Sequence, residues 1–187
     1  MLRELVVKNR SYRRFYQEVA IATKTLLELI ELARLTATGS NIQSLKYKLI
    51  NTKEKNEQVF SCLSWAGYLK DWNGPQEGEK PAAYIIILNN KQLKKNPQYD
   101  IGLACQSILL GAVEKGLGGC MFGSVNREKL GTEFSIPNEL EITLIIALGS
   151  PKEKVIIDDV VEEDIKYWRD ENQVHHIPKR KLDDLIL

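Results

Sequence analysis

The seven residues Ala82-Ala83-Tyr84-Ile85-Ile86-Ile87-Leu88 decide the fold class of this chain. Nearly all of them are apolar, and the last four are large apolar residues in a row. Such a short continuous run is typical of a strand that is buried on both faces of a sheet. A similar run at residues 141–148 predicts a second buried strand, and shorter strands are expected at 47–50 and 120–122.

Helical patterns surround these expected strands. Residues 23–35 carry a helical apolar stripe made of Leu26, Leu27, Leu29, Ile30 and Ala33, with Thr23 as the expected cap. Residues 97–115 predict a long helix, whose small residues Gly102, Ala104, Gly111 and Ala112 allow another helix to pack closely. Shorter helices are expected at 2–9, 56–64 and 126–134, whereas residues 149–181 show no regular pattern. This order predicts an α+β protein with one sheet covered by helices.

The composition of the chain excludes several classes of protein. The 187 residues suffice for a single domain over 1–187, and 43% hydrophobic and 27% charged residues are ordinary globular values. A net charge of +1 does not produce the strong positive electrostatic potential that general nucleic-acid binding requires. The apolar runs are too short to span a membrane, and the first ten residues carry charges where a signal peptide would be apolar. We therefore expect a cytoplasmic protein that binds neither nucleic acid nor membrane.

The cysteines and histidines do not predict a metal site or a disulfide. Cys62, Cys105 and Cys120 are odd in number and form no C-x-x-C pair, so each is expected to pack as a small apolar residue. His175 and His176 are adjacent and are expected on a surface tail, without the spacing of the usual metal ligands. No metal is expected.

A basic segment near the N-terminus, Arg10-Ser11-Tyr12-Arg13, has the composition of an anion site. Two guanidiniums three residues apart, with a hydroxyl between them, can converge on a phosphate monoester through charge-assisted hydrogen bonds. A basic turn that is simply solvated is the alternative interpretation of this segment taken alone.

The glycines Gly116-Leu117-Gly118-Gly119 do not indicate a Rossmann fold. They follow an expected helix and precede an expected strand, whereas a dinucleotide-binding fingerprint follows a strand and opens a helix. A glycine cap at the end of the long helix explains the start of this loop. The chain also contains no G-x-x-x-x-G-K-[ST] and no G-x-S-x-G motif, and no side chain is singled out as catalytic.

Four segments taken in order resemble the FMN-dependent nitroreductase family. They are Arg10–Arg13, Thr38–Gln43, the long helix from Asp100 to the glycines before Cys120, and Pro178–Lys181. The resemblance covers nearly all of the chain. It implies an α+β fold with a central, mostly antiparallel sheet covered by helices. It also implies an intertwined homodimer with FMN at the interface between the subunits.

The resemblance also implies which residues bind the cofactor. Arg10, Ser11 and Arg13 would hold the phosphate and ribityl chain, and Lys179 and Arg180 would also meet the phosphate. The family's Pro-Ser-x-x-Asn-x-Gln-Pro-Trp loop falls on residues 37–45, where Thr38, Ser40, Asn41 and Gln43 would contribute, although Ala37, Ser44 and Leu45 replace Pro, Pro and Trp. The ring would be lined by Phe122, Gly123 and Ser124.

Three aromatic residues are candidates for a lid over the flavin. Trp65, Tyr68 and Trp72 lie in a segment that is longer and helical in larger members of the family. For Trp65, packing in the core or at the dimer interface is an equal alternative. Trp72 sits in Asp-Trp-Asn-Gly-Pro, a turn-like context that favours exposure.

The function implied is that of an FMN oxidoreductase. Hydride would pass from NADH or NADPH through FMN to a nitro group, a quinone or a similar acceptor, with donor and acceptor taking turns at one site. Other interpretations remain open: a flavin-binding module without turnover, a specialised enzyme such as a dehalogenase or heterocycle oxidase, and an α+β protein that binds no flavin.

Overall fold

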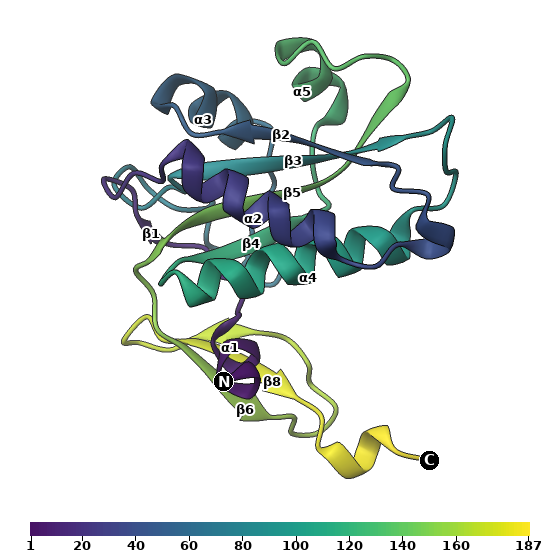
Figure 1. Ribbon diagram of the computed structural model, residues 1–187. Helices are drawn as coiled ribbons and strands as arrows, with labels where there is room; N and C mark the ends of the chain where they lie inside the picture. The colour runs from purple at the N-terminus through teal and green to yellow at the C-terminus, as the bar shows by residue number, and fades with distance from the viewer.

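The computed structural model describes all residues 1–187, and its centre is an antiparallel sheet (Figure 1). Strand β3 (Ala83–Asn90) pairs with β2 (Leu45–Ile50) on one side and with β5 (Leu140–Pro151) on the other. The far edge of β5 pairs with both β4 (Gly118–Phe122) and β1 (Phe15–Tyr16). The four strands expected from the sequence all form, and every pair in this sheet is antiparallel.

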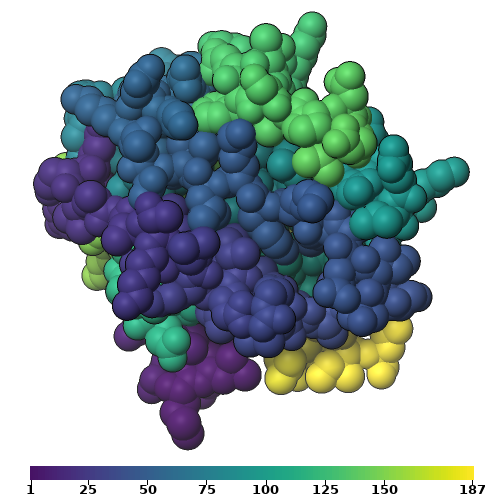
Figure 2. Space-filling view, turned by 45° about the horizontal axis from the view of Figure 1, so that its top comes forward, coloured from purple at the N-terminus to yellow at the C-terminus, as the bar shows by residue number.

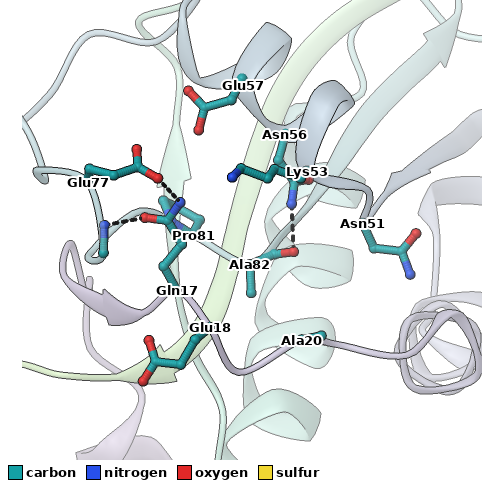
Figure 3. A pocket seen from close by; sticks show the side chains of 11 residues that line it. Gln17, Glu18, Ala20, Asn51, Lys53, Asn56, Glu57, Glu77, Pro81 and Ala82 are labelled. Atoms are coloured by element: carbon teal, nitrogen blue, oxygen red, sulfur yellow. Dashed lines mark hydrogen bonds between the residues drawn. The ribbon is translucent and has the colours of Figure 1, made fainter.

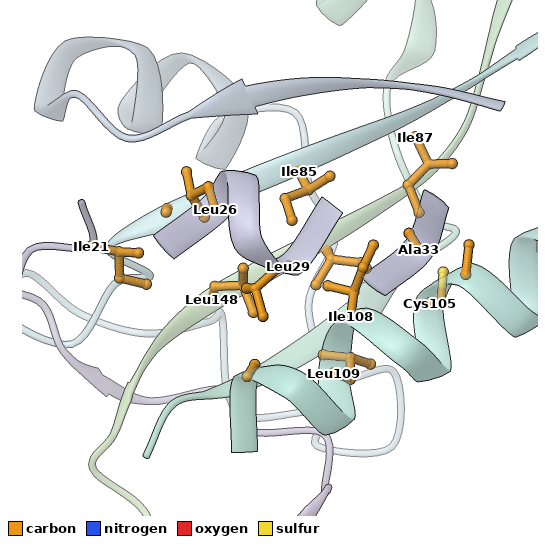
Figure 4. Packing of buried hydrophobic residues seen from close by; sticks show 14 of the residues in the cluster. Ile21, Leu26, Leu29, Ala33, Ile85, Ile87, Cys105, Ile108, Leu109 and Leu148 are labelled. Carbon is orange, nitrogen blue, oxygen red and sulfur yellow. The ribbon is translucent and has the colours of Figure 1, made fainter. Parts of the chain in front are cut away.

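Helices cover both faces of this sheet, as the apolar run of β3 predicts. Helices α2 (Thr23–Leu35) and α4 (Gln98–Glu114) pack on the face that carries Ile85 and Ile87 (Figure 4). Helices α3 (Lys53–Phe60) and α5 (Arg127–Glu133) pack on the opposite face, beside Tyr84 and Ile86; they dominate the upper part of the molecule in Figure 2. Successive residues of a strand point to opposite faces, so one apolar run supplies both cores.

Gly111 lies where α4 packs on α2. A Cβ at this position would come within 2.2 Å of Leu32 Cδ1, so a larger residue would force the end of the Leu32 side chain to move. Gly102 has no such neighbour. The expected stripe of α2 is partly wrong, because Leu27 is 57% exposed while Leu26, Leu29 and Ala33 are buried.

The N-terminus of α2 also differs from the prediction. Ala22, not Thr23, is the N-cap, and it makes no side-chain capping bond. Thr23 is instead the first helical residue, and its Oγ1 accepts a hydrogen bond from Asn51 Nδ2 at 3.0 Å. This bond ties the start of α2 to the residue that follows β2.

A second sheet lies beyond β5, in a region where the sequence indicated no regular structure. Its central strand β8 (His175–Lys179) pairs in parallel with β6 (Val155–Asp159) and antiparallel with β7 (Trp168–Arg169). These strands are short and rich in charged residues, so they lack the apolar run that marks β3. Helix α1 (Leu2–Lys8) lies at the same end of the molecule, as does the C-terminus (Figure 1).

None of the helices combines the length and the apolar character needed to cross a membrane.

Candidate functional site

A small cleft forms where the N-terminal basic turn meets β4, α4 and β8. It has a volume of about 210 Å³. It is lined by Asn9, Arg10, Ser11, Gln106, Leu109, Gly119, Cys120, Met121, Ile177 and Lys179. The turn is held against the sheet because Ser11 bridges to Gly119 in parallel and the Tyr12 amide donates to the Gly119 carbonyl at 3.0 Å. Segments from both ends of the chain therefore meet at one strand.

The charges around this cleft favour an anion. Arg10 and Lys179 line it, and no carboxylate does. Arg10 Nη2 donates to the Val6 carbonyl at 2.7 Å, which fixes the guanidinium against the end of α1. Arg10 Nε is buried and has no hydrogen-bond partner. A buried, unpartnered donor of this kind costs free energy unless a ligand oxygen satisfies it.

Arg13, the second arginine of the turn, does not line the cleft. Its guanidinium is buried behind the turn, where Nη1 donates to the Ser11 carbonyl at 3.1 Å and lies 3.0 Å from His175 Nε2. Its Cζ sits 4.4 Å from the centre of the Tyr167 ring. The structure thus brings Arg10, Ser11 and Lys179 together but uses Arg13 to brace the turn from inside.

Arg180, which the sequence paired with Lys179, is also outside the cleft. It is exposed and forms an ion pair with Glu163. Adjacent residues at the end of β8 point in different directions, which explains why only Lys179 reaches the cleft.

The loop expected to complete the site lies elsewhere in the single chain. Thr38 and Gln43 line a groove of about 510 Å³ beside α2 and the start of α4. Ser40, Asn41 and Gln43 have φ angles of 53°, 54° and 53°, in the left-handed region that non-glycine residues rarely adopt. Thr38 Oγ1 is buried without a partner. Left-handed residues gathered in this way are held by their surroundings and are common in binding loops.

Asp100 holds this loop from the first turn of α4. Its Oδ1 accepts the Gly39 amide at 2.9 Å and its Oδ2 pairs with Lys94 Nζ at 2.6 Å. Burial by itself raises the pKa of this carboxyl, but the Gly39 amide and the Lys94 ammonium outweigh it, so the pKa is lowered overall. Asp100 is therefore an ionised carboxylate. The sequence placed it at the start of the helix without showing this role.

The residues after the glycine turn divide between core and surface. The Phe122 ring is buried, whereas Gly123 and Ser124 are exposed and Arg127 Nη2 donates to the Gly123 carbonyl at 2.9 Å. Met121, which points to the face opposite Phe122, is 46% exposed and lines the cleft. Sequence reasoning missed Met121, although strand alternation would have separated it from Phe122.

Gln106 and Asn9 are further cleft residues that sequence reasoning missed. Asn9 Nδ2 donates to Gln106 Oε1 at 3.4 Å, joining the end of α1 to the middle of α4. The sequence feature that could have identified Gln106 as a cleft residue is its polar side chain within a mostly apolar stretch of the long helix.

The aromatic residues proposed as a lid pack against the protein to different degrees. The Trp65 ring lies 4.6 Å from Phe122 and 5.5 Å from Phe60 between ring centres, which favours the packing interpretation. Trp72 is half-buried between Trp65 and the Arg169 guanidinium, so its expected exposure is wrong. Tyr68 is 49% exposed.

The cysteines and His175 are all buried, and the placement of His175 on a surface tail is wrong. Cys120 is the only thiol in the cleft, and burial raises its pKa. This thiol is therefore uncharged at neutral pH and adds no negative charge to the cleft.

A further groove of about 410 Å³ lies between the loop after β1, the start of α3 and the segment before β3 (Figure 3). Glu18, Glu57 and Glu77 line it, and Gln17 spans it through hydrogen bonds to Glu77 and to the Gly78 amide. Lys53 also lines this groove and Lys80 pairs with Glu57 and Glu77, so its charge is mixed, and none of the residues predicted from the sequence lies there.

Comparison with known proteins identifies the family and the fold of the chain. The model of the nitroreductase family matches residues 6–150. A nitroreductase family protein from Clostridium novyi NT is 22% identical, with a TM-score of 0.68 over 81% of this chain and 86% of that chain. An FMN-dependent nitroreductase from Clostridium difficile R20291 is 22% identical, with a TM-score of 0.65 over 80% and 87%. CLA-ER, an enone reductase of a gut-bacterial fatty acid saturation metabolism, is 15% identical, with a TM-score of 0.70 over 87% and 93%.

At these identities the solved structures establish a shared fold, and the family model matches well over half of the sequence. The α+β architecture and the antiparallel sheet agree with both. The chain belongs to the nitroreductase family.

Proposed function

We propose that this protein is an FMN-dependent oxidoreductase that takes hydride from NADH or NADPH and delivers it to a nitro compound, a quinone or a similar acceptor. The observation that carries the proposal is the basic cleft lined by Arg10, Ser11 and Lys179 and by no carboxylate. Membership of the nitroreductase family and the fold shared with an FMN-dependent nitroreductase support it.

The residues present suit a flavin phosphate. Arg10 and Lys179 would supply two positive charges, and Ser11 would add a hydroxyl. Bound FMN would supply the reversible two-electron chemistry, while the chain supplies position and electrostatics. Arg10 and Ser11 would bind the phosphate end, and the exposed backbone of Gly123 and Ser124 would lie along the ring, beyond the buried Phe122. No side chain is assigned as a catalytic acid or base.

We further propose that two copies of the chain build each site. The cleft of about 210 Å³ is smaller than the roughly 300–1,000 Å³ of most small-molecule sites, so it accommodates only the phosphate end of the cofactor. One face of α4 beside it exposes Tyr99 (87%) and Leu103 (47%), and such apolar faces mark interfaces. A second copy on this face would bring its own Thr38, Ser40, Asn41 and Gln43 to the ring.

The other residues predicted from the sequence have changed roles in this proposal. Arg13 braces the phosphate-binding turn, and Arg180, which is paired with Glu163 outside the cleft, is assigned no contact with the phosphate in the single chain. Tyr68 is the most exposed candidate for a lid, with Trp65 and Trp72 packed behind it. Residues 1–187 would act as one FMN-binding domain, since β8 near the C-terminus and the turn after α1 line the same cleft.

The visible absorption spectrum of the purified protein tests the proposal. FMN is added, unbound FMN is removed by gel filtration, the solution is made anaerobic, and NADH or NADPH is titrated in. Flavin bands that bleach, and then return when a quinone or nitroaromatic is added, are expected. Bands that persist with both donors would indicate a flavin-binding module without NAD(P)H turnover. A protein without flavin bands after FMN is supplied would refute the proposal.

A further inference from the structure

A buried ionic cluster lies directly behind the basic turn, in the junction between the main sheet and the second sheet. We name it the Glu153 cluster, after the carboxylate at its centre. Its other members are Arg13 from the turn, Arg169 from β7, His175 from β8 and Tyr167. Glu153 and Arg169 have side chains that are 0% and 8% exposed, and Arg13 and His175 are also buried.

The charges of this cluster do not balance. Glu153 is the only carboxylate that contacts the buried Arg13 and Arg169. His175 adds no negative charge, and burial together with the neighbouring arginines lowers its pKa to about 4, so it is neutral at pH 7. The Glu153 carboxylate therefore serves the Arg169 guanidinium and the Arg13 backbone amide, while the buried Arg13 guanidinium contacts the Ser11 carbonyl, His175 and the Tyr167 ring and has no carboxylate of its own. Breaking a buried pair by removing one partner is strongly destabilising, so Glu153 has no substitute here.

The cluster controls the shape of the turn through backbone contacts. One oxygen of Glu153 accepts the backbone amide of Arg13, and the other pairs with Arg169 at 2.9 Å. Arg13 in turn donates from its guanidinium to the Ser11 carbonyl at 3.1 Å. Ser11 is thus held from behind while its other side faces the cleft beside Gly119.

Glu153 and its neighbour Lys154 also link the turn to β8, the strand that carries Lys179: the Glu153 carboxylate pairs with Arg169 of β7, which lies opposite His175 of β8. The His175 amide donates to the Lys154 carbonyl at 2.9 Å, so the residue after Glu153 is tied to the first residue of β8. Lys179 is the last residue of that strand. Arg10 and Ser11 on one side and Lys179 on the other are therefore positioned by one buried junction.

We propose that Glu153 is a positioning residue for flavin phosphate recognition, because it fixes the Arg10–Ser11 turn and β8 in the arrangement that forms the cleft. This inference rests on the proposed function, because it names the residue that makes the same site prefer FMN over a flavin without a phosphate. Glu153 itself does not line the cleft and would not touch the cofactor.

Comparison of FMN with riboflavin, which lacks only the phosphate, tests the proposal. In Glu153→Gln we expect FMN affinity to fall about tenfold, the lower end of the loss for a hydrogen bond to a charged group, while riboflavin affinity changes less than about twofold. Both dissociation constants are measured by flavin fluorescence quenching on the full chain. A mere loosening of the fold would weaken both flavins equally, and that result would overturn the proposal.

Glu79→Gln is the matched control. Glu79 also joins the N-terminal segment to the residues after β5, since it pairs with Arg14 at 2.6 Å and Lys152 at 3.1 Å, but it contacts neither Arg13 nor the turn. We expect the ratio of FMN to riboflavin affinity to stay unchanged in this variant. An equal drop of the ratio in both variants would also overturn the proposal.

A shorter carboxylate keeps the test decisive if Glu153→Gln does not fold. Glu153→Asp retains the charge near Arg169 but withdraws the oxygen from the Arg13 amide, so the ratio should still fall. A ratio equal to that of the wild type would refute the positioning role alone. A wild-type protein that binds neither flavin would refute both this proposal and the proposed function.

Discussion

His175 and His176 show how strongly the burial and the contacts of a side chain change over one position along a strand. They are adjacent in β8, yet His175 is fully buried against Arg13 and Tyr167. The His176 ring instead stacks on the half-exposed Trp168 at 4.1 Å. Alternation along the strand produces this difference, and it became visible only once β8 was known to be a strand.

The buried position of His175 makes the stability of the protein depend on pH. Burial, with Arg13, Arg169 and His176 nearby, lowers the pKa from 6.5 to about 4 in the folded protein. Below pH 6.5 the unfolded chain binds a proton that the folded protein does not. Stability from this group is therefore complete above pH 6.5 and falls by about 2 kcal/mol on going to pH 5.

Urea unfolding at pH 7.5 and pH 5 measures this loss. His175→Gln should reduce the pH dependence by that amount, because glutamine does not titrate. A variant with the same pH dependence as the wild type would contradict the assignment of this loss to His175.

Arg10 is the residue on which cofactor affinity should depend most directly. Arg10→Ala is expected to weaken FMN binding by about 1.5–3 kcal/mol, since a hydrogen bond to a charged group is lost. Isothermal titration with FMN measures the change. Arg3→Ala, an exposed arginine of α1, is the control and should bind FMN like the wild type. If Arg10→Ala binds FMN as tightly as the wild type does, the assignment of Arg10 to the phosphate is wrong.

At the scale of elements, the loop from Thr38 to Gln43 and the start of α4 form one unit. The loop carries three left-handed residues, and Asp100 holds it through the Gly39 amide and the Lys94 ion pair. The carboxylate side chain of Asp100 is 1% exposed. An ion pair with one buried partner depends on its geometry far more than a surface pair does.

Asp100→Asn should therefore cost about 1–3 kcal/mol of the free energy of unfolding, because Lys94 loses its partner while the Gly39 amide keeps an acceptor. Glu31→Gln breaks the exposed Glu31–Arg34 pair of α2 and should change the free energy of unfolding much less, because solvent screens that pair. Urea midpoints of the two variants and the wild type give the comparison. Equal costs for the two substitutions would show that Asp100 does not anchor the loop.

At the scale of the whole molecule, the two predicted halves of the cofactor site lie apart. The basic cleft and the groove with Thr38 and Gln43 are lined by different residues of α4 and share none. Association of two copies through the exposed face of α4 would bring the halves together, and it would couple dimerisation to FMN binding.

Leu103→Glu should therefore shift the protein toward monomer and weaken FMN in parallel, because a charge is placed in an apolar interface. Sedimentation velocity with and without FMN measures both effects. Val19→Lys, at a residue that is 44% exposed in the loop after β1, is the control and should leave the assembly unchanged. A wild-type monomer that binds FMN tightly would contradict the shared site.

Patterns local to the chain determined the layers of the fold. The apolar run of β3, the helical stripe of α4 and the order of elements were enough to predict an α+β protein with one main sheet. The second sheet escaped prediction because its strands are short and charged, and their burial comes from contacts with distant residues. The expected Thr23 cap failed for a related reason, since tertiary contact with Asn51 uses that hydroxyl.

The sequence by itself also determined the family, through four short segments in a fixed order, and it predicted Arg10, Ser11, Arg13, Lys179 and Arg180 as one phosphate site. Only the tertiary structure decided that Arg13 supports the turn from behind and that Glu153 holds it there. The physical reason is that the sequence gives the type of a charged residue but does not say whether its side chain faces solvent, a ligand or another charge. Its role depends on which partners the fold places around it and on whether water can still reach it.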